Sequence, residues 1–294
     1  MKNILVLGGT RFFGRKLVEL FIEDGHNVAI MTRGQSGNPF GNKVEHIIAD
    51  RTNKEELANK FEGRKFDIVY DNICYSPNEA FEFCEIFNGK IGRLVFTSTL
   101  AVYEADGAEK SEVDFDPYSY KIIMGDKTDF TYGEGKRQAE AVFFKYAEFP
   151  VAAVRFPIVM GEDDYTRRLH FHVERIAREE PIGFLDMDAE MPFIQAAEAA
   201  QFLKWAGISG IEGSYNAASN GKISLHELIA LIEQEVGKAA QISLAGPEDI
   251  RSPYAIPASW LMINDKAAKD GFRFSNLHDW LQPLIKALVT TKNT

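Results

Sequence analysis

Short apolar runs recur along the first half of the chain and predict buried strands. They lie at Ile4–Leu7, Val28–Met31, Val44–Ile48, Phe66–Tyr70, Leu94–Thr97 and Val151–Arg155. Amphipathic stretches between most of these runs predict helices at 14–24, 53–61, 77–88 and 132–147. This alternation is typical of a parallel, doubly wound α/β sheet, because parallel neighbours are joined by helical crossovers. A ligand is then expected at the carboxyl edge of the strands.

The first apolar run passes directly into a glycine turn and then into an amphipathic helix. The turn reads Gly8-Gly9-Thr10-Arg11-Phe12-Phe13-Gly14. Gly14 lets the helix pack closely on the strand, and the unpaired N–H groups of the helix start suit a dinucleotide pyrophosphate. Arg11 stands where the middle glycine of such a turn is expected, so its side chain has to swing aside and could contact phosphate. A tight strand-to-helix connection without a ligand is the alternative.

Beyond about Gly161 the pattern changes to a second type of region. It comprises a charged helical stretch at 165–180, a mixed stretch at Phe193–Ile194, a late strand at Gly213–Ala217, and two or three helices from about Lys222. The sequence therefore predicts an α/β fold, a Rossmann-type doubly wound parallel sheet with a smaller, mostly helical C-terminal substrate lobe. We expect the dinucleotide-binding domain at residues 1–160 plus 190–218, and the substrate-binding lobe at 161–189 plus 219–294.

The end of the second strand favours NADP over NAD. NAD-specific sites usually carry Asp or Glu there, because the carboxylate accepts hydrogen bonds from the ribose 2′-hydroxyl. This chain has Thr32 followed by Arg33. Together with Arg11, Arg33 could bracket a 2′-phosphate. NADP is the favoured cofactor and NAD the alternative, and two arginines on surface loops are the other interpretation.

Tyr132 and Lys136 are four residues apart and fall on one face of a predicted helix. A nearby ammonium favours phenolate over phenol and lowers the pKa of a tyrosine from about 10 toward the operating range. Tyr132 is therefore a candidate general acid/base. An isolated pair of this kind is weak evidence, but here it follows the glycine turn and a Ser/Thr-rich strand end at Phe96–Thr99.

Four motifs together resemble the extended short-chain dehydrogenase/reductase superfamily, and within it the NAD(P)-dependent epimerase/dehydratase group. They are Gly8-x5-Gly14, Thr99-x2-Val102-Tyr103, Tyr132-x3-Lys136, and Arg155-Phe156-Pro157 followed by Gly161. The resemblance covers nearly the full length. It implies hydride transfer at the nicotinamide C4, coupled to a hydroxyl or carbonyl of a small polar substrate such as a nucleotide sugar. It leaves epimerisation, dehydration and reduction open.

The resemblance also implies roles for individual residues. Thr99 would hydrogen-bond the substrate oxygen, Tyr132 would transfer its proton, and Lys136 would hold the ribose hydroxyls. The candidate catalytic residues are thus Thr99, Tyr132 and Lys136. The candidate cofactor-binding residues are Gly8, Thr10, Arg11, Phe12, Phe13, Gly14, Thr32, Arg33, Asp50, Arg51, Asn72, Tyr132, Lys136, Phe156 and Pro157. The candidate substrate-binding residues are Tyr75, Thr99, Arg167 and Arg168.

Two of these assignments have structural alternatives. Asp50 would accept a hydrogen bond from the adenine amino group by resemblance, but a helix cap explains it equally well. Arg167 and Arg168 could hold phosphates of a small molecule, or form the solvated start of a helix. Tyr254 and Trp260 either line the substrate pocket or pack the core of the second lobe.

The segments Gly8–Gly14, Met31–Gly34 and Asp71–Pro77 most resemble an atypical branch that includes the chloroplast stem-loop-binding proteins. This opens two rival functions: an RNA-binding or RNA-cleaving protein, and a dinucleotide sensor without turnover. The formal net charge of −10 weighs against RNA, because nucleic-acid binding depends on clustered Lys and Arg. A further departure is Gln195, where the group usually has His.

The remaining expectations concern location, metals and partners. No stretch approaches the ~20 apolar residues of a membrane span, and the start lacks the zones of a signal peptide, so we expect a cytoplasmic protein that does not bind membranes. Cys74 and Cys84 are expected to be reduced and buried. His170 and His172 point to different faces of a helix, so no metal is expected. The resemblance suggests a homodimer formed through the helices near 77–88 and 132–147.

Overall fold

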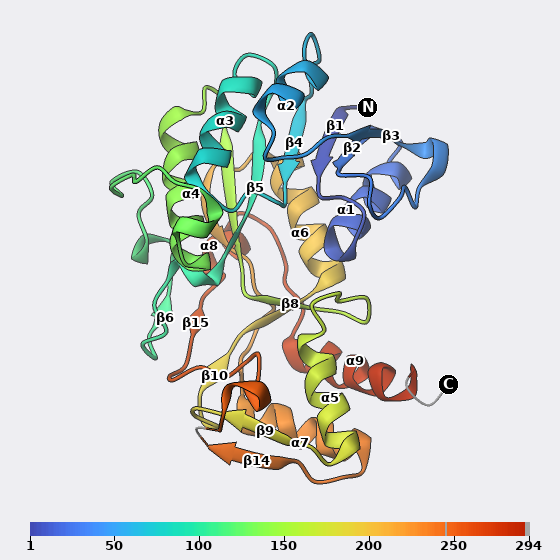
Figure 1. Ribbon diagram of the computed structural model, residues 1–294, viewed down its shortest axis with the longest axis vertical. Coiled ribbons are helices and arrows are strands. Elements are labelled where there is room, and N and C mark those ends of the chain that lie inside the picture. Colours follow the sequence, from blue (N-terminus) through green and yellow to red (C-terminus); the bar gives the residue numbers. More distant parts are fainter. Residues whose placement is uncertain (245, 292–294) are drawn as a thin grey trace.

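The computed structural model describes residues 1–244 and 246–291 and is built on a seven-stranded, fully parallel sheet (Figure 1). The strand order is β12-β7-β5-β4-β1-β2-β3. The bounds are β1 Asn3–Leu7, β2 Asn27–Thr32, β3 Glu45–Ile48, β4 Ile68–Asp71, β5 Leu94–Thr99, β7 Val151–Phe156 and β12 Gly213–Asn216. The direction of strand addition reverses between β1 and β4, which is where an open α/β sheet offers a crevice at its carboxyl edge.

Helices cover both faces of this sheet. The helices on one face are α1 (Phe12–Glu23) and α6 (Ala196–Ser209), and those on the other are α2 (Lys54–Lys60), α3 (Pro77–Phe87) and α4 (Tyr132–Tyr146). Ile4 and Val6 of β1 enter the first core, and Leu5 and Leu7 enter the second. Burial on both faces explains why the strands read as continuous apolar runs. The predicted fold class is confirmed, and each strand and helix predicted in the first half of the chain is present.

A long connection links β5 to α4 and carries four short elements. They are η2 Leu100–Val102, β6 Glu109–Lys110, η3 Glu112–Asp114 and η4 Lys127–Asp129. The buried side chain of Arg155 on β7 donates hydrogen bonds to the backbone carbonyls of Glu112 and Phe115, each at 3.0 Å. The same guanidinium pairs with buried Glu140 at 2.6 Å. The two carbonyl contacts of Arg155 therefore hold the first half of the connection on the sheet, and Glu140 neutralises the buried guanidinium.

The second lobe has its own apolar core. Its main helices are α5 (Arg168–Arg178), α7 (Leu225–Val236) and α9 (Leu277–Thr291), and a short parallel pair joins β9 (Pro181–Phe184) to β14 (Gln241–Leu244). The remaining short elements of the second half are β8 Ile158–Met160, β11 Phe193–Gln195, β10 Glu190–Met191, β13 Ile223–Ser224, β15 Leu261–Met262 and η5 Glu248–Ile250. Two others belong to the main sheet: η1 Gly41–Lys43 lies between β2 and β3, and α8 Asp265–Lys269 packs on β12. Between these segments α6 and β12 return to the main sheet (Figure 1).

Several side chains that the sequence left open lie in the cores. Tyr254 is 1% exposed and packs in the second-lobe core, and the indole nitrogen of Trp260 donates to the Tyr103 carbonyl at 3.2 Å. Cys74 and Cys84 are free and buried. Within the described residues there is no helix long and apolar enough to cross a membrane. The same ranges contain no cluster of His, Cys, Asp and Glu able to hold a metal ion.

Candidate functional site

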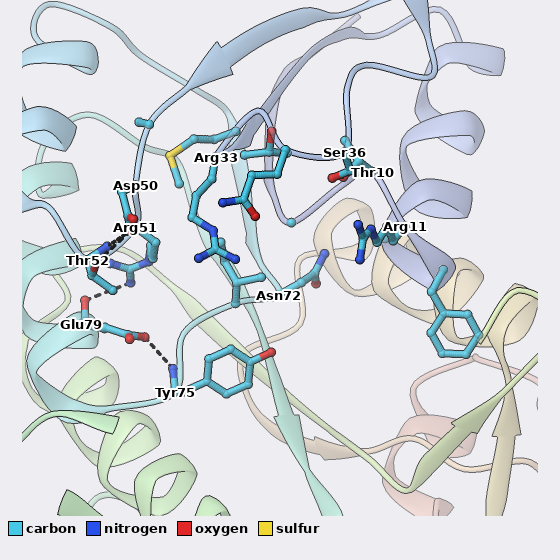
Figure 2. Close-up of a pocket in the computed structure, with 18 of the residues that line it drawn as sticks. Thr10, Arg11, Arg33, Ser36, Asp50, Arg51, Thr52, Asn72, Tyr75 and Glu79 are labelled. Carbon is cyan, nitrogen blue, oxygen red and sulfur yellow. Dashed lines mark hydrogen bonds between the residues drawn. The ribbon is translucent and has the colours of Figure 1, made fainter. Parts of the chain in front are cut away.

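A cavity of about 430 Å³ opens at the carboxyl ends of β1 to β4, where the strand order reverses (Figure 2). Its volume falls in the range of small-molecule sites. Twelve of the predicted site residues line it: Gly8, Thr10, Arg11, Phe12, Phe13, Gly14, Thr32, Arg33, Asp50, Arg51, Asn72 and Tyr75. The structure thus gathers most of the predicted cofactor residues, which come from four separate connections, around one space.

The glycine turn between β1 and α1 forms one wall of the cavity. A Cβ atom at Gly14 would lie 2.4 Å from the Gly8 carbonyl oxygen, so only glycine permits this approach. Arg11 has an extended backbone, with φ −135°, and therefore replaces the expected glycine without backbone strain. Phe12, at the start of α1, adopts a left-handed φ of +51°, an unusual conformation that is often found at ligand sites. The turn thus holds the start of α1 against the end of β1, and the N–H groups of a helix start suit an anionic ligand.

Two arginines meet the cavity from different turns. Arg11 is exposed and its guanidinium carbon lies 5.9 Å from the centroid of the Tyr165 ring. Arg33, just after β2, is also exposed. In the described part of the chain neither guanidinium forms a hydrogen bond or ion pair with a side chain or carbonyl. Thr10 and Ser36 place their hydroxyl groups 3.2 Å apart between these turns (Figure 2). These groups together offer unpaired charge and hydroxyl donors to an anionic ligand.

The hydroxyl of Thr32 is already engaged within the protein. It lies 2.8 Å from His46 Nε2 and accepts a hydrogen bond from the Gly34 backbone N–H at 3.1 Å. Thr32 therefore forms part of the cavity wall, and the charged side chain at the end of this strand is Arg33. No carboxylate stands at the position that an NAD-specific site would use.

Asp50 lies two residues after the end of β3, and its carboxylate binds within the turn that follows. Its carboxylate accepts hydrogen bonds from the backbone N–H and the hydroxyl of Thr52, at 2.9 and 2.8 Å. These two bonds, with a contribution from nearby Arg33, lower the pKa of Asp50, which keeps the group ionised. The helix-cap alternative for Asp50 is wrong, because Asn53 is the N-cap residue of α2 and the Asp50 carboxylate binds Thr52 within its own turn. The Asp50 residue also lines the cavity.

Arg51 is buried, and its contacts hold together the segments that line the cavity. Its guanidinium pairs with Asp71 at 3.0 Å and donates to the Glu79 backbone carbonyl at 2.9 Å. The carboxylate of Glu79 in turn accepts the backbone N–H of Tyr75 at 2.7 Å. This chain of contacts fixes the segment after β4, on which Asn72 and Tyr75 face the cavity (Figure 2).

Asn72 lies deeper in the same segment. Its side-chain oxygen accepts a hydrogen bond from the Thr97 hydroxyl at 2.6 Å, which fixes the amide group. Its Nδ2 has no hydrogen-bond partner within the described residues. Asn72 thus joins β4 to β5 at the cavity.

Lys136 and Tyr132 occupy the first turn of α4, beside the cavity rather than in its wall. Lys136 is 1% exposed, and its ammonium donates to the backbone carbonyls of Cys74 and Thr97, at 2.7 and 2.8 Å. The centroid of the Tyr75 ring lies 4.6 Å from the same ammonium. Tyr132 is 55% exposed, and its ring centroid is 6.3 Å from that of Tyr75. Tyr75 is thus the residue that links this pair to the cavity.

The predicted residues at the ends of β5 and β7 are neighbours. Thr99 is paired with Phe156 in the sheet register, and its hydroxyl accepts a hydrogen bond from the Ala101 backbone N–H at 3.1 Å. Phe156 and Pro157 are buried. The Phe156 ring centroid is 6.0 Å from that of Phe13, which lines the cavity. Phe156 therefore packs against a residue of the cavity wall, and Thr99 lies next to Phe156 on the neighbouring strand.

Arg167 and Arg168 do not line the cavity. Arg167 has an exposed side chain that pairs with Glu174, and Arg168 is the first residue of α5. From this region Tyr165 reaches the cavity instead, and Lys127 reaches it from the connection before α4. Neither Tyr165 nor Lys127 was predicted. Lys127 stands in a connection without apolar periodicity, and Tyr165, which the sequence placed at the start of the helix predicted at 165–180, lies in the connection before α5.

Comparison with known proteins agrees with this arrangement. Residues 4–76 match the family described as the NAD dependent epimerase/dehydratase family. The chain is also 30% identical to the chloroplast stem-loop binding protein of 41 kDa b from Arabidopsis thaliana, in a match that covers 35% of this chain and 30% of that protein. The match thus spans less than a third of the curated relative.

Solved structures resemble the chain over nearly its full length. UDP-glucose 4-epimerase from Thermus thermophilus, in complex with NAD, has a TM-score of 0.73 at 20% identity, covering 98% of both chains. dTDP-glucose 4,6-dehydratase from Bacillus anthracis, also with NAD, has a TM-score of 0.77 at 17% identity, covering 100% of this chain and 97% of the other. At these identities the likeness establishes the fold.

Proposed function

We propose that this chain, whose residues 4–76 match the NAD dependent epimerase/dehydratase family, binds NADP(H) in the cavity at the carboxyl edge of its sheet. With it, the protein would oxidise or reduce a hydroxyl or carbonyl of a small polar substrate, such as a nucleotide sugar. The observation that carries the proposal is the glycine turn with two unpaired arginines beside it. NAD is the alternative cofactor.

The cavity residues fit a dinucleotide in the following way. The start of α1 and the Gly8–Gly14 turn would receive the pyrophosphate, because the N–H groups of a helix start suit an anion and Gly14 lets this helix start lie against the Gly8 carbonyl. Arg33 and Arg11 would receive a 2′-phosphate, since planar guanidinium groups bind phosphate in a bidentate manner. Asp50, held ionised by Thr52, would accept the adenine amino group.

The proton chemistry is assigned to the first turn of α4. A bound nicotinamide would supply the hydride acceptor or donor. Tyr132 would take or give the proton of the reacting oxygen, and Thr99 would hydrogen-bond that oxygen. Lys136 would hold the ribose hydroxyls of the cofactor, and its two backbone carbonyl contacts fix its ammonium beside the Tyr75 ring. This pairing of proton transfer with hydride transfer is the proposed reaction step.

The cofactor assignment is tested by titration calorimetry with NADPH and NADH. Replacing Arg33 by Ala should weaken NADPH binding roughly ten- to a hundredfold, the value of a charge-assisted contact, and leave NADH binding unchanged. Arg15→Ala is the matched control, because Arg15 is exposed on α1, pairs with Glu19, and does not line the cavity. Equal NADPH affinity in Arg33→Ala and wild type would show that the 2′-phosphate assignment is wrong.

The catalytic assignment is tested by cofactor-dependent turnover on a panel of carbonyl compounds and nucleotide sugars. Tyr132→Phe should lower turnover about 10²- to 10⁴-fold, the usual contribution of a positioned acid/base. Full activity in Tyr132→Phe would overturn the role of Tyr132. NADPH binding without turnover on the whole panel would favour the sensor instead.

RNA binding is the second candidate, and the name of the Arabidopsis relative is the observation that favours it. The chain carries 43 acidic against 33 basic residues, which opposes a polyanion. A gel-shift assay with a stem-loop RNA at physiological salt decides between the candidates. Submicromolar, salt-sensitive affinity would support the RNA function.

A further inference from the structure

We propose that Lys127 forms an anion-binding subsite at the rim of the cavity, which holds a phosphate or carboxylate group of the substrate. We call Lys127 and the neighbouring ring of Tyr75 the Lys127 subsite. The inference rests on the proposed function, since it concerns the second ligand that would meet the bound dinucleotide.

Lys127 is placed over an aromatic ring at the cavity. It begins η4, and its Nζ lies 4.5 Å from the centroid of the Tyr75 ring. Both residues line the cavity, and the Tyr75 hydroxyl points into it (Figure 2). A cation above a ring is attracted by the negative face of the ring, so the exposed lysine has a preferred position there. The Lys127 subsite therefore combines an ammonium with a phenolic donor.

The charge of Lys127 is not neutralised within the described residues. Its ammonium forms no hydrogen bond or ion pair there, although acidic residues outnumber basic ones in the chain. The neighbouring carboxylates are engaged elsewhere: Asp126 accepts from the Asn78 side chain at 2.8 Å, Asp129 from the Asp126 backbone at 2.7 Å, and Glu79 from the Tyr75 backbone at 2.7 Å. An unpaired cation at a cavity attracts anionic ligands.

The turn that carries Lys127 is fastened to α3. The backbone N–H of Asn78 donates to the Gly125 carbonyl at 3.3 Å, and the Asn78 amide donates to the Asp126 carboxylate at 2.8 Å. Because Tyr75 and Asn78 belong to the same segment after β4, the two halves of the subsite are held together. A prearranged site of this kind loses less conformational freedom on binding.

The position of Lys127 indicates that the anionic group it binds belongs to the substrate rather than to the cofactor. The cations proposed for the dinucleotide, Arg11 and Arg33, follow β1 and β2. Lys127 comes from the connection before α4, five residues ahead of Tyr132, and η4 packs on α4. A molecule whose anionic group contacts Lys127 would thus lie on the side of the cavity where Tyr132 begins its helix. Phosphate and carboxylate share the required chemistry.

The test titrates the NADP⁺-saturated protein with inorganic phosphate, and separately with malonate, by calorimetry at low ionic strength. Saturation with NADP⁺ occupies the proposed sites at Arg11 and Arg33, so the remaining anion binding reports on the Lys127 subsite. Lys127→Met keeps the apolar stem over Tyr75 and removes the charge. Lys127→Arg restores the charge. The matched control is Lys121→Met, which removes an exposed lysine of the same connection that does not line the cavity.

The expected result is binding of at least one of the two anions by wild type, weakened roughly tenfold in Lys127→Met and retained in Lys127→Arg and Lys121→Met. Binding of phosphate alone would indicate that the substrate carries a phosphate group. Binding of malonate alone would indicate that it carries a carboxylate. No binding of either anion, or an equal loss in Lys121→Met, would overturn the subsite. If neither NADP⁺ nor NAD⁺ binds, the proposed function fails, and the same titrations on the free protein then decide the subsite separately.

Discussion

Lys136 donates a hydrogen bond from its buried ammonium to the backbone carbonyl of Thr97 at 2.8 Å. This contact ties the first turn of α4 to the end of β5, and the second contact, to the Cys74 carbonyl, ties it to the segment after β4. Lys136 is therefore part of the framework of the site as well as of its proposed chemistry. Tyr132 on the same turn is exposed and has no such framework role.

The first prediction separates these two roles. Lys136→Met leaves two carbonyl acceptors without a partner and should lower the free energy of unfolding by about 2–4 kcal/mol, with loss of turnover. Tyr132→Phe should change stability by less than about 0.5 kcal/mol. Urea denaturation of both variants measures this contrast. A Lys136→Met protein as stable as wild type would contradict the framework role.

The second prediction concerns the glycine turn. In Gly14→Ala the new Cβ would meet the Gly8 carbonyl oxygen at 2.4 Å, so the turn or α1 must shift. We expect destabilisation of about 1–3 kcal/mol and at least a roughly tenfold loss of NADPH affinity, measured by urea denaturation and calorimetry. Gly183→Ala is the control, because its nearest atom would lie at an ordinary 3.4 Å in the second lobe. Unchanged NADPH affinity in Gly14→Ala would place the ligand elsewhere.

The third prediction concerns the ion pair of Glu140 and Arg155, whose side chains are both 0% exposed. Glu140→Gln keeps the volume and leaves the Arg155 charge buried without its partner. The free energy of unfolding should fall by about 3–5 kcal/mol. The exposed pair of Glu19 and Arg15 provides the control, since Glu19→Gln should cost less than about 0.5 kcal/mol. Similar urea midpoints for the two variants would refute the prediction.

The fourth prediction is a pH dependence of stability caused by His172. Burial lowers the pKa of His172 to about 4, and its Nε2 lies 2.7 Å from the Ser252 hydroxyl. Between about pH 6.5 and 4 the unfolded chain binds a proton that the folded chain does not, so stability falls as the pH falls through this window. The loss of stability caused by this group reaches about 3 kcal/mol below about pH 4. No loss from this group is expected above about pH 6.5.

The measurement is urea denaturation of wild type and His172→Gln across that window. The variant should lose less stability than wild type between about pH 6.5 and 4, by up to about 3 kcal/mol. His226→Gln replaces an exposed histidine and should follow the wild-type curve. Parallel curves for wild type and His172→Gln would show that His172 does not titrate as described.

The sequence predicted the sheet and its helices because their signals are local. Apolar runs such as Ile4–Leu7 mark strands buried on both faces, and the cap and first-turn pair Ser76-Pro77 marks the start of α3. The predicted resemblance to the NAD(P)-dependent epimerase/dehydratase group agrees with the match of residues 4–76 to that family. The roles of the individual site residues, the domain bounds, the preference for NADP and the homodimer stay predictions.

The contacts of the site were less predictable because they depend on distant segments. The spacing of Tyr132 and Lys136 predicted that the ammonium lies near the Tyr132 phenol, whereas its contacts in the structure are two backbone carbonyls and the rings of Tyr75 and Phe96. Lys127 and Tyr165 reach the cavity from connections whose course is set by tertiary packing. No periodic pattern in those connections could have indicated them.

The most direct test of the central claim is calorimetric titration of the wild-type protein with NADPH. The account predicts one binding site per chain with a micromolar dissociation constant. The affinity should fall as salt is added, because Arg11 and Arg33 contribute charge to binding. No binding of NADPH at millimolar concentration would contradict it.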